Sequence, residues 1–234
     1  TEKNGTFENN LTQLNNFAAD CGIPAEMILI PSTGHLKEDL LPDGHLPYQD
    51  DMLFAKAKET LINVTFYDFR EELKAADTPE QNICYRTDHH LTVWGNQALY
   101  RAYLDAHDAY PWAQTFTPTP GFYGTTWSGS GYWGVNPDDI YTWDSHAEVT
   151  VTITDSGQEP VVSDSVFFPA HLAEMDKYPV YLDGNHTLVK IENPGAADDT
   201  TLLIVKDSYA HCFTAMLAEN YQTIYMIDLR YYRD

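Results

Sequence analysis

The sequence predicts an α/β fold in which a β-rich insertion interrupts an open, mostly parallel sheet. Short, continuous apolar runs alternate with helical patterns in the first half of the chain, and such runs suit parallel strands buried on both faces. After Ala109 the composition changes, because Gly, Pro, Tyr and Trp crowd residues 110–145. The alternation of strand and helix returns from residue 202 onward. We therefore expect one domain over residues 1–234, with the insertion at about residues 110–200.

Each element of the first half has a local signal. Apolar residues recur on one helical face from Phe7 to Cys21, and Gly22 follows at a position where helices commonly end. The apolar run at residues 27–30 is closed by Pro31 and suits a buried strand. The same patterns predict a helix at 50–60, a strand at 62–66, a short helix at 70–75, a strand at 83–85 and a helix opened by Thr92.

The second half of the chain is richer in strands. Residues 148–154 and 161–168 have strand composition, and Asp183-Gly184 is a typical hairpin turn. Residues 193–200 are acidic and rich in turn formers, so we expect a loop there. The closing elements are expected to be a strand at 202–205, a helix that follows Asp207-Ser208 and runs through Ala218, and a strand at 224–227.

The charge excludes several classes of function. The 234 residues include 13 Lys and Arg against 35 Asp and Glu, which gives a net charge of −22. A surface this negative repels phosphate backbones and anionic lipid, which argues against nucleic-acid and membrane-surface roles. No apolar run approaches the roughly 18 residues of a membrane span. No basic and apolar leader opens the chain. The chain starts at Thr1 without a methionine, so removal of a leader ahead of Thr1 stays open.

Cys21, Cys84 and Cys212 form an odd set without C-x-x-C spacing. Neither a disulfide framework nor a zinc ribbon is indicated. Three buried thiols that pack as small hydrophobes are the favoured interpretation, and one bridge plus a free thiol is the alternative. We expect Cys212 to pack beneath the last helix, one turn after Ser208.

Two motifs at expected strand ends carry candidate chemistry. Asp88-His89-His90 lies between a strand and a helix, and Lys206-Asp207-Ser208-Tyr209 follows the strand at 202–205. Loops after parallel strands open at the same edge of a sheet, so the two motifs can meet there. A serine hydroxyl needs an imidazole to take its proton, and the imidazole needs a carboxylate to fix its tautomer. Asp88, His90 and Ser208 supply all three groups, and the backbone amide of Ser208 can bind an oxyanion.

Other interpretations of these motifs stay open. Asp207-Ser208 is also a common helix N-cap, and Asp88-His89-His90 is equally a helix-entry turn with surface imidazoles. Asp and paired His can bind a metal, although adjacent histidines in extended backbone point to opposite sides. We expect no metal and no cofactor. His107 and His211 show no partner in the sequence and are expected at the surface.

The tract at residues 121–134 (GFYGTTWSGSGYWG) is the third notable feature. It is most simply a packed loop, but exposed rings would suit stacking against sugars. Trp127, Tyr132 and Trp133 are the candidate substrate-binding residues in it. Gly124 is the candidate for a second oxyanion donor, because glycine permits close backbone approach.

Residues 85–92 (YRTDHHLT), the segment LLIVKDSYAHCF at 202–213 and the closing IDLRYY at 227–232 together resemble the DHHW protein family. These proteins are similar to SGNH-like O-acetyltransferases of bacterial exopolysaccharide export, such as the alginate O-acetyltransferases. The resemblance implies a three-layer α/β/α sheet and an extracytoplasmic location, either secreted or anchored through a segment not present here. The chain departs from the family name at Leu91, where a Trp is expected, and Trp94 follows three residues later.

The resemblance also implies roles for single residues. Asp88 and His90 match the D-x-H motif that supplies acid and base, and Ser208 matches the nucleophile. We expect Ser208 to attack an ester carbonyl, with His89 and Asp207 in supporting positions. Hydrolysis and transfer to a glycan hydroxyl both stay open, and the acyl donor could be a membrane protein.

The net charge of −22 favours a neutral or amino-sugar glycan over a polyanion, because a negative surface opposes the approach of negative chains. Two alternatives to an esterase or O-acetyltransferase stay open. The chain could be a catalytically degenerate SGNH-fold module that binds glycan through its aromatic tract. It could also be a metalloenzyme that uses Asp88 and the His pair.

Overall fold

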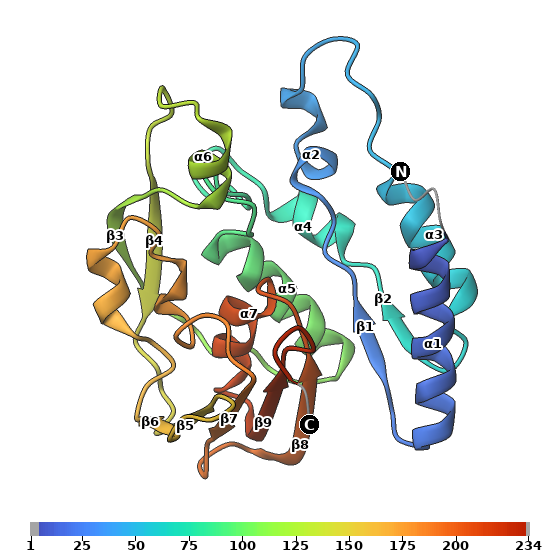
Figure 1. Ribbon diagram of the computed structural model, residues 1–234, viewed down its shortest axis with the longest axis vertical. Coiled ribbons are helices and arrows are strands. Elements are labelled where there is room, and N and C mark those ends of the chain that lie inside the picture. The colour runs from blue at the N-terminus through green and yellow to red at the C-terminus, as the bar shows by residue number, and fades with distance from the viewer. Residues whose placement is uncertain (1–4, 233–234) are drawn as a thin grey trace. The chain divides into compact units, whose positions relative to one another are not determined.

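The structure is a computed structural model that describes residues 5–232 (Figure 1). The chain divides into two compact units, Thr1–Ala75 and Ala76–Asp234. Helices and strands are mixed in both units, which confirms the predicted α/β class. None of the described helices combines the length and apolar character needed to cross a membrane.

The first unit is a small helical layer over two parallel strands. Its core contains Leu11 and Ala18 of one helix, Ala57 of a second, and Val64 beside the strands. The first helix ends as predicted, because Gly22 adopts a left-handed conformation with φ 64° and donates its amide to the Ala18 carbonyl. The elements are α1 (Thr6–Cys21), β1 (Glu26–Ile28), α2 (Thr33–Leu36), η1 (Glu38–Leu40), α3 (Asp50–Thr60), β2 (Thr65–Tyr67) and α4 (Arg70–Ala76), and β1 pairs with β2.

The second unit contains a two-stranded sheet and a five-stranded sheet. The smaller sheet pairs β3 with β4, and the larger one has the order β6-β5-β7-β9-β8. Helix α7 connects β8 to its parallel neighbour β9, and the rings of Tyr103 in α5 and Phe213 in α7 meet edge to face at 5.7 Å. The elements are α5 (Val93–Ala106), β3 (Phe116–Phe122), α6 (Thr125–Ser130), β4 (Asp138–Trp143), β5 (Thr150–Thr154), β6 (Val161–Ser163), η2 (Pro169–Ala173), η3 (Tyr178–Val180), β7 (Leu188–Glu192), β8 (Asp198–Val205), α7 (Ala210–Leu217) and β9 (Tyr221–Ile227).

The larger sheet is mixed, not mostly parallel as expected. Only β8 and β9 pair in parallel within it, while β5, β6 and β7 join as antiparallel neighbours. Strands from the predicted insertion therefore extend the sheet of β9 instead of forming a separate layer. The three-layer arrangement and the single domain over residues 1–234 stay predictions.

Several local predictions need correction. β8 begins at Asp198, inside the loop expected at 193–200, and β6 ends at Ser163 although a strand was expected at 161–168. The tract at 121–134, expected as a packed loop, contains the helix α6.

Two further predictions were wrong. Residues 83–85 form no strand, because the amides of Ile83 and Cys84 donate to the side chains of Asp77 and Asn82 instead of to a neighbouring strand. Cys84 makes only an isolated bridge with Leu91. Asp183-Gly184 is a turn with positive φ, but it leads from η3 to β7 and joins no pair of neighbouring strands.

Candidate active site

Three side chains from the two motifs form one hydrogen-bonded relay in the second unit. His90 Nδ1 lies 2.5 Å from Asp88 Oδ2, and His90 Nε2 lies 2.8 Å from Ser208 Oγ. Asp88 and His90 are 3% and 4% exposed, while Ser208 is half-buried. The relay thus has a buried acid and base, and its serine lies nearer to solvent. This is the order of exposure that attack on an outside substrate requires.

The Asp88 motif is held in place from its N-terminal side. Asp138, at the start of β4, accepts hydrogen bonds at its carboxylate from the Thr87 amide at 2.8 Å and the Thr87 hydroxyl at 2.6 Å. It also accepts the Arg86 amide at 3.2 Å. Thr92 then caps α5 by accepting the Gly95 amide, as its position before the helix predicted. The motif therefore lies fixed between β4 and α5.

Ser208 lies in the short turn between β8 and α7. Lys206 still donates its amide to Ile227, so the serine comes two residues after the end of the ladder. The N-terminus of α7 has no side-chain cap, and the Ser208 hydroxyl faces His90. Asp207 is exposed and accepts the Tyr209 amide at 2.9 Å, which stabilises the turn. The N-cap interpretation of Ser208 is therefore wrong.

The protonation state of the relay follows from its hydrogen bonds. Burial would raise the pKa of Asp88, but hydrogen bonds from His90 and Thr125 and the neighbouring imidazole lower the pKa below its ordinary value. Asp88 is therefore a carboxylate and can only accept, so His90 carries its proton on Nδ1. His90 Nε2 is then free to accept the Ser208 hydroxyl proton, as a general base must.

The Gly124 amide, expected as a second oxyanion donor, is bonded to another residue. It donates to the Thr87 hydroxyl at 3.4 Å, so this amide is engaged within the protein instead of facing Ser208 as an oxyanion donor. A Cβ at Gly124 would lie 2.3 Å from the Asp88 Cβ, so the glycine is needed for close packing against the acid. Among residues 5–232, no acceptor is found for the Ser208 amide, which leaves this group to bind an oxyanion.

His89 lies beside His90, not on the opposite side as expected. The two ring centroids are 3.9 Å apart, and His89 Nδ1 lies 2.8 Å from the Thr125 hydroxyl. Burial, together with the neighbouring His90 ring, lowers the pKa of His89. One ligand atom each from Asp88, His89 and His90 lies within 4.8 Å of the others. Holding a cation there would require Asp88 to give up hydrogen bonds from His90 and Thr125, so the geometry favours the relay.

The aromatic tract at residues 121–134 is bonded to the Asp88 motif near its middle, and its last rings are exposed to solvent. The Trp127 amide donates to the Thr87 carbonyl at 2.9 Å, and this ties α6 to the Asp88 motif. The Trp127 ring packs against those of Tyr123 and Trp133, each with a centroid distance of 4.5 Å. Tyr132 and Trp133 are 65% and 73% exposed. Two of the three candidate sugar-binding rings therefore face solvent, and their role stays a prediction.

Sequence reasoning missed four residues that support the relay. Thr125 donates both its amide and its hydroxyl to Asp88, and Asp138 holds Thr87. Tyr209 donates its hydroxyl to the His89 carbonyl at 2.7 Å, and Tyr178 stacks on the His90 ring. Thr125 and Tyr209 were inside segments already singled out, but neither side chain was assigned a role. No spacing in the sequence relates Tyr178 or Asp138 to the motif.

Several expectations about histidines and cysteines need correction. His211 is buried, not at the surface, and accepts a hydrogen bond from Lys206 Nζ at 2.7 Å, because the helix faces inward there. His107 is half-buried and its Nδ1 lies 2.7 Å from the Tyr103 carbonyl. All three cysteines are free. Cys84 and Cys212 are buried as expected, but Cys21 is exposed because it lies in the last turn of α1.

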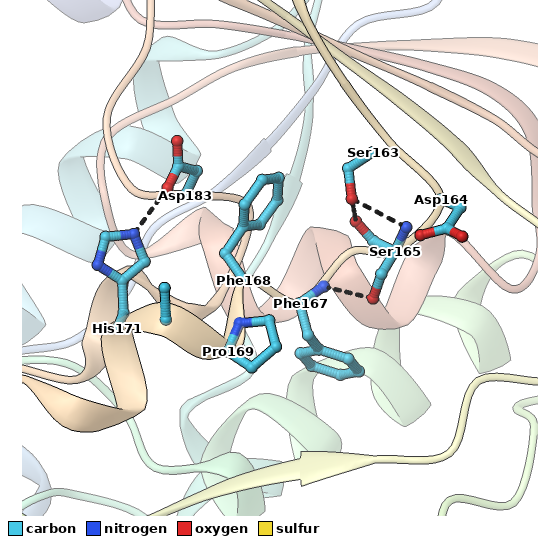
Figure 2. A pocket seen from close by; sticks show the side chains of 9 residues that line it. Ser163, Asp164, Ser165, Phe167, Phe168, Pro169, His171 and Asp183 are labelled. Atoms are coloured by element: carbon cyan, nitrogen blue, oxygen red, sulfur yellow. Dashed lines mark hydrogen bonds and ion pairs between the residues drawn. The ribbon is translucent and has the colours of Figure 1, made fainter.

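A cavity of about 360 Å³ lies apart from these residues. Figure 2 shows its lining, in which Phe167 and Phe168 stand between hydroxyl groups on one side and the His171–Asp183 pair on the other. His171 Nε2 lies 2.6 Å from Asp183 Oδ1. None of the relay residues belongs to the lining, which consists of Ser163, Asp164, Ser165, Phe167, Phe168, Pro169, Ala170, His171 and Asp183.

Comparison with known proteins identifies the family. The family model described as DHHW protein matches residues 53–227. The chain belongs to the DHHW protein family. This confirms the resemblance seen in the Asp88-His89-His90 and Ser208 segments. No curated protein matches the chain.

Solved structures of other members and relatives share the fold. A DHHW family protein from Eubacterium siraeum is 22% identical, with a TM-score of 0.77, over 96% of this chain and 77% of that one. PatB1 from Bacillus cereus, in a structure with a sulfonyl adduct, is 19% identical with a TM-score of 0.79, over 99% of this chain and 82% of that one. At these identities the likeness concerns the fold of the DHHW protein and not its chemistry.

Proposed function

We propose that this DHHW protein catalyses O-acyl transfer or ester hydrolysis on a carbohydrate, with Ser208 as nucleophile, His90 as base and Asp88 as orienting acid. The observation that carries the proposal is the continuous relay from Asp88 Oδ2 through both nitrogens of His90 to Ser208 Oγ. A serine that only caps a helix has no need of a buried imidazole and carboxylate behind it.

The reaction proceeds in two halves. Ser208 Oγ attacks the acyl carbon while His90 Nε2 takes the hydroxyl proton, and the Ser208 amide binds the oxyanion. Collapse breaks the ester bond, and His90 returns the proton to the leaving oxygen, which leaves an acyl group on Ser208. In the second half, His90 takes a proton from water or a sugar hydroxyl, whose oxygen attacks the acyl carbon. Ser208 leaves with the proton that His90 gives back, and the acyl group is now on the acceptor.

Two further observations support the choice of reaction and substrate. One structure of PatB1 carries a sulfonyl adduct, and sulfonyl reagents form such adducts with activated nucleophiles. The exposed rings of Tyr132 and Trp133 suit stacking against a sugar. The charge of −22, with the exposed Asp207 beside the nucleophile, favours a neutral or amino-sugar glycan over a polyanion.

The family resemblance supports the remaining parts of the proposal. The protein acts outside the cytoplasm and receives its acyl group from a donor that a membrane protein could deliver. Its strands and helices belong to a three-layer SGNH-type arrangement. In support of that arrangement, Ser208 follows the end of β8, where sites of parallel α/β sheets are found.

Hydrolysis of a small chromogenic acetyl ester tests the proposal. Wild type is compared with Ser208→Ala and His90→Ala, with chelator present, and Ser163→Ala serves as the matched serine control. Both relay variants should lose about three orders of magnitude or more in kcat, and the control should keep its rate. Mass spectrometry after treatment with a sulfonyl fluoride should show one covalent sulfonyl group on wild type and none on Ser208→Ala. Turnover that persists in Ser208→Ala refutes the assignment.

The exposed Tyr132 and Trp133 favour one second candidate, a module that binds glycan without turning it over. This candidate predicts that Ser208 resists the sulfonyl reagent and that glycan binding falls in Trp133→Ala. A wild-type protein that binds glycan but neither turns over esters nor takes the reagent would replace the first proposal with this one.

A further inference from the structure

Tyr178 contacts both the base and the backbone of the nucleophile. Its ring lies parallel to the His90 imidazole, with 3.7 Å between centroids and 5° between planes. Its hydroxyl donates to the carbonyl of Ser208 at 3.3 Å. The side chain is 4% exposed, so water does not compete for either contact. One buried residue therefore bridges two members of the relay that lie 118 positions apart in the sequence.

The segment that carries Tyr178 is itself firmly held. The Tyr178 amide, at the first residue of η3, donates to Asp176 Oδ1 at 3.1 Å. The neighbouring Lys177 is buried, and its ammonium donates to the carbonyls of Leu172 and Glu174. The Tyr178 ring also meets the Tyr181 ring edge to face at 5.4 Å. A stacking partner anchored at its backbone and at its ring can hold another ring in place.

The stack restrains the plane of the His90 ring. Rotation of the imidazole about its Cβ–Cγ bond would carry Nδ1 and Nε2 away from Asp88 Oδ2 and Ser208 Oγ. A parallel ring at 3.7 Å opposes that rotation on one face, and the His89 ring, 3.9 Å away, also contacts the imidazole. The aromatic face also favours the cationic imidazole that forms during the reaction.

The Tyr178 hydroxyl contacts the Ser208 backbone. It stays protonated, because burial raises its pKa well above the ordinary value. It can therefore keep donating to the Ser208 carbonyl, which also accepts the His211 amide at 3.3 Å in the first turn of α7. The turn that sets the direction of Ser208 Oγ is thus held by the same side chain that holds His90.

We propose that Tyr178 is a positioning residue of this site, whose ring fixes the plane of His90 and whose hydroxyl fixes the turn of Ser208, a role that rests on the proposed function. A residue that only fills the core would contribute to stability and leave the reactivity of Ser208 unchanged. The two roles therefore differ in what they predict for kcat.

Three variants separate these roles. Tyr178→Leu removes the ring and the hydroxyl, Tyr178→Phe removes the hydroxyl alone, and Tyr100→Leu is the matched control. Tyr100 in α5 is also fully buried, but among the described residues it has no ring contact with His90 or Tyr178. Each variant is measured for kcat and KM with the chromogenic ester, for the rate of Ser208 sulfonylation, and for thermal stability. The NMR signals of the His90 ring, assigned with His90→Gln, are recorded as well.

Tyr178→Leu should lower kcat and the sulfonylation rate roughly 10- to 100-fold, because small displacements of reacting groups have effects of that size, while KM changes by less than about threefold. Tyr178→Phe should show a smaller loss, since the stack remains and only the hydrogen bond to the Ser208 carbonyl is removed. Tyr100→Leu should lose stability to a similar extent but keep kcat. The His90 ring protons should lie upfield in wild type and Tyr178→Phe, and move downfield in Tyr178→Leu.

Equal kcat and sulfonylation rates in Tyr178→Leu and the control overturn the positioning role. If Tyr178→Leu does not fold, an absence of the upfield signals in wild type overturns it instead, and their presence with a lowered kcat in Tyr178→Phe supports it. A wild-type protein that neither turns over ester nor takes the reagent refutes the proposed function. The NMR signals still report the stack in that case, so the two failures are distinguishable.

Discussion

Under the proposed function, replacing Asp88 with asparagine should greatly reduce ester turnover without unfolding the protein, for a reason that lies in the hydrogen bonds of Asp88. Asp88 Oδ1 accepts the backbone amide of Thr125 at 3.0 Å, and an amide N–H can only donate. In Asp88→Asn the side-chain oxygen must therefore stay on that side, and the new NH₂ group must face His90. It then donates to His90 Nδ1, which loses its own proton to Nε2. The base is locked in the wrong tautomer, with a proton pointing at Ser208.

The expected loss follows from that tautomer. A relay whose imidazole cannot accept the serine proton loses about 10³- to 10⁴-fold in kcat, while substrate binding is spared. The assay is kcat and KM for the acetyl ester in wild type, Asp88→Asn and Asp139→Asn, an exposed control on β4. Nitrogen-15 shifts of His90 report the tautomer independently. Activity within tenfold of wild type, or a proton still on Nδ1, refutes the reasoning.

Three further predictions concern the surroundings of the relay. In Gly124→Ala the new methyl meets Asp88, so calorimetry should show a loss of about 1–3 kcal/mol together with reduced ester turnover. Hydrogen bonds from Arg230 lower the pKa of Asp228 to about 2. The ionised Asp228 therefore stabilises the fold above about pH 4, and this contribution is lost as pH falls toward 2. In urea unfolding, the free energy of unfolding of Arg230→Gln should decline less over that pH range than that of wild type. A thiol reagent should modify Cys21 quickly and the two buried thiols only on unfolding.

The members of the relay were predictable because their chemistry is local to two motifs. Asp88 and His90 stand two residues apart, and Ser208 follows an apolar strand, so the expected ends of buried strands brought them to one region. That expectation held although residues 83–85 form no strand. The reason is that the motif is fixed by Asp138 and by the start of α5, and a ladder at this point is not needed.

What could not be predicted depends on contacts between distant residues. Thr125 lies 37 positions from Asp88 and Tyr178 lies 88 positions from His90, and no periodicity or spacing marks such pairs. The mixed sheet was missed for a related reason, because strand composition does not reveal whether a neighbour runs parallel or antiparallel. His211 has no partner nearby in the sequence other than Lys206, and only the inward face of α7 explains its burial.

The segment expected as an insertion supplies three of the residues that hold the relay in place. Thr125 on α6 donates to Asp88, Asp138 on β4 holds the preceding threonine, and Tyr178 on η3 stacks on His90. All three lie between residues 110 and 200, whereas the acid, the base and the serine lie outside that range. The two motifs supply reactive groups, and the segment between them supplies the rigidity that a hydrogen-bonded relay needs. Substitutions in this segment should therefore change the rate of the reaction as well as the choice of substrate.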